Sequence, residues 1–556
     1  MSASTDPHPP VRRDNSPPSV IPAVPSDGPD PAHARVDRGR TLLVGLVATV
    51  VAAIGSWSVS LWSDEVATLS AAQRSTAELG RLLGDIDAVH GAYYALMHAW
   101  VSVVGTSPFA LRLPSALAVG VAAAGVHVLG SRIAGPRAGL VAAALMAFLP
   151  RVTWAGVEAR PFALATALAV VLTVVAHGAT RTGVPARSRR WGLALYALVL
   201  AVGVAVNLYV VLVAGAHVVT LLARRGTRRA ALGLVLAAAA GAAAVSPLVL
   251  VALGQGGQLG TQDLGLAHLA QNVLVNQWFL GETPTATTAD GTLAGAASAD
   301  GVWKIAAVLL ALVAWVLVAG VVARALRARR THGAHPTEGT PRAQRVELLA
   351  WALPWLLLPT VLVVAAAVVS PSLYNARYFG ISGGAVALLL AAALADLPRR
   401  AAVAVGLVLV LLVAPVYVSQ RTTTAKSGTD WVLVAAHLDG RTEAGDAVYF
   451  APRDPFVDGV VRRSMRAVSL GYPEPFVGLV DVTLLDSPVE GGTLFGRSVP
   501  LAERLDRLED VDTLWVLRRH DVDAGAAAED LLLEEAGFDV VDVWDGPQTR
   551  VVELRR

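Results

Sequence analysis

The apolar stretch TLLVGLVATVVAAIGSWSVSL, residues 41–61, decides the fold class of this chain, and Trp62-Ser63-Asp64-Glu65 follows it directly. A helix of about 20 apolar residues crosses the ~30 Å hydrocarbon core of a bilayer. The two adjacent carboxylates would then lie where this helix meets water, and burying them without partners would cost several kcal/mol. This acidic pair is therefore the first candidate for a functional site.

The composition of the whole chain is typical of a membrane protein. Of its 556 residues, 54% are hydrophobic and only 16% are charged. Apolar runs recur as far as residue 417, and in lipid such runs can satisfy their backbone groups as helices. We therefore expect a polytopic α-helical membrane protein with about eleven transmembrane helices. The net charge of +2 does not indicate a nucleic-acid partner, and the absence of cysteine excludes disulfides and thiolate sites.

Arginine clusters in the short connectors predict the topology. The positive-inside rule assigns such clusters to the cytoplasm, and one arrangement of spans brings all of them there. In that arrangement residues 66–83 and 90–104 lie on the outer face as interfacial helices. The expected spans are residues 41–61, 109–131, 137–150, 159–178, 191–206, 207–223, 230–252, 302–324, 346–369, 379–396 and 401–418.

Three parts are expected along the chain. Residues 1–40, rich in proline, serine and aspartate, predict a disordered cytoplasmic tail. Residues 41–420 form the transmembrane domain, and residues 421–556 an extracytoplasmic α/β domain, because this last part holds over half of the acidic residues and no span. Its pattern predicts helices at 431–438 and 526–536 and strands at 446–451, 513–517, 540–544 and 550–554.

Polar residues gather in the loops that this topology places outside. Carboxylates can act as general bases, arginines can hold an anion, and aromatic rings can pack against a sugar. The first loop supplies Asp64, Glu65, His90, Tyr93 and Tyr94, the second Trp154, Glu158 and Arg160, the third Tyr374, Asn375, Arg377 and Tyr378, and the tip of a hairpin Asn207 and Tyr209.

Each group also has an ordinary structural explanation. Asp64 and Glu65 could simply be acids in the first turn of a helix, where the helix dipole favours them. Glu158 and Arg160 could be an interfacial ion pair, and Arg377 an anchor whose charged end reaches the interface. The functional interpretation is favoured because the topology, derived without these residues, places them all on one side.

The order of the motifs resembles a known family over residues 61–451. The chain is similar to GT-C glycosyltransferases of the protein O-mannosyltransferase and aminoarabinose-transferase type, above all to bacterial mannosyltransferases of the glycosyltransferase 39-like group. The motifs are Trp62-Ser63-Asp64-Glu65, His90-Gly91-Ala92-Tyr93-Tyr94, Leu111-Arg112-Leu113-Pro114-Ser115-Ala116, Glu158-Ala159-Arg160-Pro161-Phe162, Ala376-Arg377-Tyr378-Phe379, Thr429-Asp430-Trp431 and Ala444-Gly445-Asp446.

This resemblance implies a plasma-membrane enzyme with a cytoplasmic N-terminus. It would move a sugar, mannose-like by the family, from a polyprenyl-phosphate donor to a glycan, lipid or protein acceptor on the outer face, with inversion. Asp64 maps to the catalytic base, with Glu65 beside it, and Glu158 maps to the acid of the second loop. Arg160 and Arg377 would lie near the carrier phosphate. The substrate-binding set would also include His90, Tyr93, Tyr94, Asn207, Tyr209 and Tyr378.

The chain departs from the family pattern at three points. Gly91-Ala92 replaces a proline-rich step, Val157 stands where glutamine is common, and Phe162 stands at a frequent tyrosine position. The cofactor is open, and Mg²⁺ or Mn²⁺ held by Asp64 and Glu158 would suit hard carboxylate ligands.

Two other function classes compete with an enzyme. A transporter or flippase of a lipid-linked saccharide would also have many spans, but transporters place polar residues near the bilayer midplane, often in repeated halves. Here the charges lie at the outer rim, which favours an enzyme. The third alternative is a membrane-anchored binding protein whose working part is residues 421–556.

Overall fold

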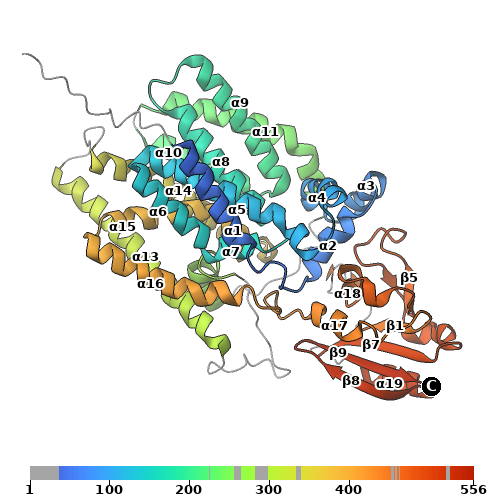
Figure 1. Ribbon diagram of the computed structural model, residues 1–556. Coiled ribbons are helices and arrows are strands. Elements are labelled where there is room, and N and C mark those ends of the chain that lie inside the picture. Colours follow the sequence, from blue (N-terminus) through green and yellow to red (C-terminus); the bar gives the residue numbers. More distant parts are fainter. Residues whose placement is uncertain are drawn as a thin grey trace, which may run out of the picture. The chain divides into compact units, whose positions relative to one another are not determined.

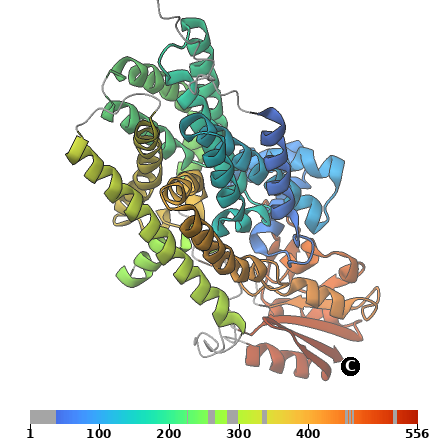
Figure 2. The same cartoon turned by 60° about the vertical axis from the view of Figure 1, so that its left-hand side comes forward.

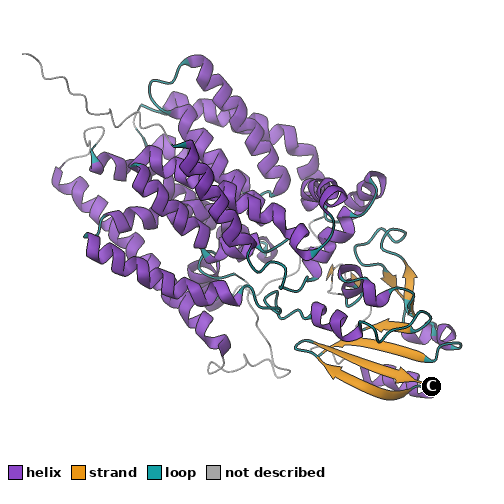
Figure 3. Cartoon of the chain, in the orientation of Figure 1, coloured by secondary structure: helices purple, strands orange, loops and turns teal. Residues whose placement is uncertain are grey.

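A computed structural model describes residues 37–224, 226–255, 265–281, 299–332, 340–451, 456–457, 460–461, 464–520 and 526–556. These residues form a large set of helices followed by a small sheet, as predicted (Figure 1, Figure 3). Most of the predicted tail, residues 1–36, lies outside the described residues, and so do parts of the loop 254–301.

The helices of the described part match the predicted spans. Eight of them are long and apolar enough to cross a membrane, or nine spans if α6 and α7, which meet at 61°, count as one. Two shorter helices overlap the remaining two predictions: the apolar helix α10 with 14 residues and α1 with 16 residues. The bounds are α1 Arg38–Ala53, α5 Pro108–Ala134, α6 Pro136–Phe148, α7 Pro150–Gly156, α8 Phe162–Thr180, α9 Ala186–Val206, α10 Val210–Ala223, α11 Arg228–Gly254, α13 Ala299–His332, α14 Pro341–Ala367, α15 Gly383–Ala395 and α16 Arg399–Ser419.

The first loop differs from the prediction in two places. The predicted span 41–61 is too long, because α1 ends at Ala53 and the next residues form turns. The single amphipathic stretch is instead two helices, α2 (Ser63–Ala72) and α3 (Thr76–Asp85). Ser75 starts α3 through a capping box, which explains the break. Beyond them, α4 (Gly91–Val104) has only 14 residues and is not among the spanning helices, as predicted.

Short helical turns connect these elements on the side of the bundle that carries α2. They include two turns before α13 and two before α15, which position the polar residues described below. Their bounds are η2 Ala88–His90, α12 Leu266–Gln271, η4 Asn272–Asn276, η5 Pro371–Leu373 and η6 Ala376–Ser382.

Close helix contact in the bundle depends on small residues, as is usual in membrane proteins. Where α1 meets α5, a Cβ on Gly120 would lie 2.6 Å from the backbone oxygen of Gly45 and would also collide with Thr49 Oγ1. Because backbone atoms cannot turn away, the two helices would have to separate.

We therefore expect Gly120→Ala to lower the free energy of unfolding by about 1–3 kcal/mol, as overpacking does. Gly406→Ala in α16 is the matched control, because no atom lies within 4 Å of its added Cβ. Thermal unfolding of the purified protein in detergent measures both. Equal transition temperatures for the two variants would contradict the close α1–α5 contact.

The C-terminal part contains the predicted α/β fold. A five-stranded sheet has the order β4-β1-β7-β9-β8, in which β1 is parallel to β4 and β7, and β9 is antiparallel to β7 and β8. All four predicted strands and both helices are present, and β4 is an additional edge strand. The bounds are α17 Trp431–Leu438, β1 Ala447–Phe450, β2 Phe456–Val457, β3 Val460–Val461, α18 Ala467–Gly471, η7 Glu474–Phe476, β4 Val480–Asp481, β5 Leu484–Asp486, β6 Arg497–Ser498, η8 Leu501–Glu503, η9 Leu505–Leu508, β7 Thr513–Arg519, α19 Ala526–Glu535, β8 Asp539–Asp545 and β9 Thr549–Arg555.

The sheet is attached at the chain segment that follows α16 (Figure 2). Buried Asp430 accepts hydrogen bonds from the backbone N–H groups of Gln548 and Thr549, at 2.8 and 2.9 Å. The same part of the chain also contacts α2, where Ser70 donates to the backbone oxygen of Leu494 at 2.7 Å. The C-terminal domain therefore helps to hold the helix that begins next to Asp64.

Candidate active site

Asp64 lies in the first turn of α2, where two arginines from distant parts of the chain meet it. Its Oδ2 is 2.8 Å from Nη1 of Arg377, in η6, and 3.9 Å from Nε of Arg160, between α7 and α8. The Asp64 side chain is 27% exposed, so it is accessible from outside the protein. The structure thus brings one predicted residue from each of the three loops into a single cluster.

The charges around Asp64 set its protonation state. Burial alone would raise the pKa of Asp64, but the guanidinium groups of Arg377 and Arg160 lower it to about 2. Asp64 is therefore a carboxylate at any physiological pH. A carboxylate with so low a pKa is also a weak base while both arginines hold it.

Arg160 links Asp64 to the predicted residues of η2 and α4. Its Nη2 is 2.8 Å from His90 Nε2, and its Nη1 donates to Tyr94 Oη at 3.3 Å. Burial and the neighbouring Arg160 lower the pKa of His90 to about 3, so the imidazole is neutral. Because arginine has only donors, His90 Nε2 accepts this bond. Tyr94 in turn donates to Asp87 at 2.7 Å, and this bond holds the Tyr94 hydroxyl in place next to Arg160.

Glu65, although adjacent to Asp64, lies in a different environment. Its two oxygens accept from Nε and Nη2 of Arg112 at 2.7 and 2.6 Å, and Oε1 also accepts the Ala159 N–H at 2.8 Å. Both side chains of the ion pair are fully buried. Burial would raise the pKa of Glu65, but Arg112 lowers it. In this geometry both oxygens of Glu65 are occupied by hydrogen bonds within the protein.

Arg112 also holds the turns that lead into α2. It donates to the backbone oxygens of Ser56, Val59 and Ser60 at 2.5, 2.8 and 3.1 Å. One buried guanidinium therefore connects α5, the turns after α1 and the start of α2. Arg112 is not among the predicted site residues, although it belongs to one of the quoted motifs.

Glu158 and Tyr93 lie deeper than the Asp64 cluster. Each is 1% exposed, and the backbone oxygen of Glu158 accepts a 2.6 Å bond from Ser115. Glu158 borders the Glu65–Arg112 pair, because the next residue, Ala159, donates its backbone N–H to Glu65. The Asp64 ion pairs use Arg160 and Arg377 rather than Glu158.

Aromatic rings form one side of the site. The ring of Tyr378 lies 4.8 Å from that of Tyr209 and 5.8 Å from that of Phe162, between centroids. Phe162 and Trp62 both lie against the Arg377 guanidinium, at 5.4 and 5.8 Å. These rings restrict the position of Arg377 through cation–π contact.

Asn207 and Tyr209, between α9 and α10, contact the aromatic side of the site and not the charged cluster around Asp64. Asn207 Oδ1 accepts the backbone N–H of Tyr209 at 3.0 Å, and the Tyr209 hydroxyl donates to the backbone oxygen of Leu373. Asn375 similarly accepts the backbone N–H of Arg377 at 3.1 Å, which fixes the turn that presents Arg377.

The other two aromatic residues of the predicted loops are buried beside the site. Tyr374 donates to Gln277 Oε1 at 2.8 Å. The Lys426 ammonium lies 3.7 Å from the centre of the Trp154 ring, and Lys426 is fully buried.

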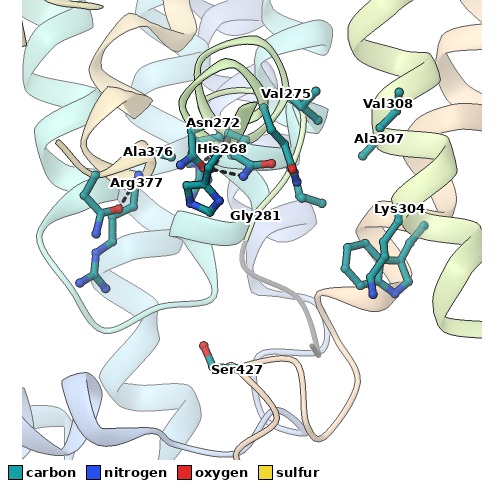
Figure 4. A pocket seen from close by; sticks show the side chains of 16 residues that line it. His268, Asn272, Val275, Gly281, Lys304, Ala307, Val308, Ala376, Arg377 and Ser427 are labelled. Carbon is teal, nitrogen blue, oxygen red and sulfur yellow. Dashed lines mark hydrogen bonds between the residues drawn. The ribbon is translucent and has the colours of Figure 1, made fainter. Parts of the chain in front are cut away.

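Arg377 also lines a cavity of about 380 Å³ (Figure 4). This pocket lies between α12, η4, the start of α13 and η6. Of its lining residues only Asn375 and Arg377 are among the residues predicted from the sequence, and Arg151, His268, Trp303 and Lys304 are not. The sequence contained one indication of this pocket, because Lys304 is one of only two lysines in the chain, the other being Lys426.

The residues around Asp64 do not fit a divalent cation. In the described part of the chain, no three histidine, aspartate or glutamate residues lie together as metal ligands. Asp64 instead forms ion pairs with two guanidinium groups, and these positive charges would repel a cation. We therefore derive no step through the metal proposed from the sequence.

No protein-family model and no curated protein matches the sequence. The structure does have similar solved structures. ArnT from Cupriavidus metallidurans bound to undecaprenyl phosphate is similar with a TM-score of 0.54 and 13% identity, over 93% of this chain and 98% of ArnT. Its apo state gives a TM-score of 0.53 and 12% identity over the same shares.

The chain has the GT-C fold. This confirms the fold predicted from the order of the motifs, over nearly the full length of both chains. In this fold, the Asp64 cluster and the pocket share Arg377.

Proposed function

We propose that this GT-C protein is a membrane glycosyltransferase that moves a sugar from a polyprenyl-phosphate donor to an acceptor hydroxyl. The observation that carries the proposal is an accessible carboxylate, Asp64, held between Arg160 and Arg377 next to a cavity. The fold supports a lipid-linked donor, because the ArnT structure is bound to undecaprenyl phosphate. We place the reaction on the extracytoplasmic face of the plasma membrane, with the N-terminus in the cytoplasm and a mannose-like sugar.

The chemistry needs one base and one anion site. Asp64 removes the proton of the acceptor hydroxyl as its oxygen attacks the anomeric carbon. The bond between that carbon and the phosphate oxygen breaks, and its electron pair stays on the polyprenyl phosphate. Arg377 and Arg160 stabilise this charge. A single displacement from the opposite face inverts the anomeric configuration.

Donor binding would also activate the base. In the free protein the two arginines keep the pKa of Asp64 low. A phosphate that binds Arg377 compensates its charge and competes for its donors, so the pKa of Asp64 rises and the carboxylate becomes a stronger base. Asp64 would then be basic only when a donor is present.

The pH dependence tests this link. Wild-type Asp64 is ionised throughout roughly pH 5–8, so kcat/KM should show no acid limb from Asp64 in this range. Arg377→Ala removes the strongest contact that lowers the pKa, so the folded-state pKa rises and activity is lost as pH falls through it. The measurement is kcat/KM against pH.

The matched control for this test is Arg81→Ala, which removes an exposed arginine from α3. It should leave the wild-type pH profile unchanged. The donor KM should also rise for Arg377→Ala and not for Arg81→Ala. An Arg377→Ala profile without a new acid limb would contradict Asp64 as the base.

The donor sugar can be tested directly. Purified protein in liposomes is given labelled polyprenyl-phosphate mannose, arabinose or glucose together with a membrane extract as acceptor. We expect label to leave the lipid from mannose in preference to the other two. Transfer from none of them would contradict the proposed donor class.

A further inference from the structure

The pocket beside Arg377 has an unusual charge balance. The described residues that line it include the cations Arg151, Lys304 and Arg377 and no aspartate or glutamate. Figure 4 shows Arg377 and Lys304 at opposite sides of the pocket, with His268 and Asn272 between them. Among the described residues, no carboxylate lies within ion-pair distance of Lys304. A cavity of this charge favours an anion.

Two residues that line the pocket carry buried polar atoms that the described protein leaves unpartnered. Trp303 is 5% exposed, yet its indole Nε1–H has no hydrogen-bond acceptor among the described residues. Asn276 Oδ1 likewise has no donor there, although its Nδ2 donates to Asn272 at 2.6 Å. A buried unpaired polar group is unfavourable by about 1–3 kcal/mol, so a ligand group that paired with these atoms would be stabilised.

The remaining residues that line the pocket are of the types that bind carbohydrates. Four amide side chains line the cavity, together with the Trp303 ring; the amides are those of Gln271, Asn272, Asn276 and Asn375. Amides offer both donors and acceptors for hydroxyl groups, and an aromatic face packs against the apolar side of a sugar ring. Hydroxyl partners and cations therefore occur in one cavity.

We propose that this pocket binds the anionic, hydroxyl-rich head of a saccharide substrate, such as a sugar phosphate or a uronate. Trp303 donates to a hydroxyl, Asn276 accepts from one, and Lys304 meets the negative charge. The inference rests on the proposed function, because Arg377 joins the pocket to Asp64. It adds specificity: a sugar with a free amine is disfavoured, because none of the described residues that line the cavity is a carboxylate that could receive its charge.

The test uses Trp303→Phe and Lys304→Ala in the full-length protein, with mannose 1-phosphate as the probe in isothermal titration calorimetry. Trp303→Phe keeps the ring but removes a donor that the described protein does not use, so the fold should be unaffected. We expect binding about 3- to 10-fold weaker for Trp303→Phe and roughly 10-fold or more weaker for Lys304→Ala. Glucosamine should bind wild type more weakly than mannose does, and Lys304→Glu should reverse that order.

Two matched controls separate the pocket from general effects. Trp351→Phe removes another buried indole N–H that has no acceptor among the described residues and does not line this cavity, and Arg81→Ala removes an exposed cation. Both should bind the probe as wild type does. Probe binding that is absent in wild type, or equal in all variants, would overturn the proposal. So would glucosamine binding as tightly as mannose 1-phosphate.

Competition identifies the source of the saccharide. If polyprenyl phosphate displaces mannose 1-phosphate, the pocket holds the donor head, and if both bind together it holds the acceptor. Asp64 does not line the cavity, so Asp64→Asn should still bind the probe, at least as tightly as wild type because Arg377 no longer pairs with a carboxylate. Probe binding without sugar transfer in wild type would therefore overturn the proposed transferase function and leave the pocket inference standing.

Discussion

Asp64→Asn will reduce sugar transfer by about 10²- to 10⁴-fold, the contribution typical of a positioned general base. Asparagine has nearly the same shape but cannot accept the acceptor's proton. The ion pairs with Arg377 and Arg160, at 2.8 and 3.9 Å, also lose their negative partner, and both arginines stay charged. Initial rates of label transfer from polyprenyl-phosphate sugar in liposomes measure the loss.

The control must show that the variant still folds. Asp439→Asn removes an exposed carboxylate of the C-terminal part and should transfer sugar as wild type does. Asp64→Asn should keep the wild-type elution profile and unfolding temperature within a few degrees. Wild-type rates in a folded Asp64→Asn protein would exclude Asp64 as the base.

Arg112→Met will have the largest effect on stability. It leaves Glu65 buried without its cation and frees the backbone oxygens of Ser56, Val59 and Ser60. Removing one partner of a buried ion pair costs about 3–5 kcal/mol. We therefore expect a strongly lowered unfolding temperature and little activity, because the start of α2 is no longer held.

Two further variants separate the ion pair from other effects. Glu65→Gln combined with Arg112→Met leaves no unpaired buried charge, so it should recover part of the stability lost by Arg112→Met alone. Arg400→Met, at an exposed arginine of α16, should unfold like wild type. Equal stability of the single and double variants would show that the Glu65–Arg112 charge pairing does not matter.

Hydropathy and charge patterns were sufficient for most of the fold. Each span is an uninterrupted apolar run, so its helix follows from local composition, and α13 and α16 appear where they were predicted. The strands of the C-terminal sheet were also predictable, because β1, β7, β8 and β9 are bounded by turn residues. The end of α1 was not, because it depends on Arg112, which is more than 50 residues away from these turns in the chain.

The site was only partly predictable for the same reason. Asp64, Arg160 and Arg377 share a loop face, and topology alone brings them to one side. That Glu65 pairs with Arg112 while Asp64 remains accessible is set by side-chain packing, and no local pattern distinguishes two adjacent acids. The pocket depends on Trp303 and Lys304 at the start of α13, where an aromatic residue and a lysine are ordinary interfacial anchors.

The most direct test of the central claim is the fate of the carrier lipid. Purified protein in liposomes is given labelled polyprenyl-phosphate sugar and acceptor, and mass spectrometry counts free polyprenyl phosphate against labelled product. A glycosyltransferase that uses Asp64 and Arg377 releases one polyprenyl phosphate for each sugar transferred, and Asp64→Asn releases almost none. If the labelled sugar instead crosses the membrane still attached to its lipid, with no polyprenyl phosphate released, the protein is a flippase and the account is wrong.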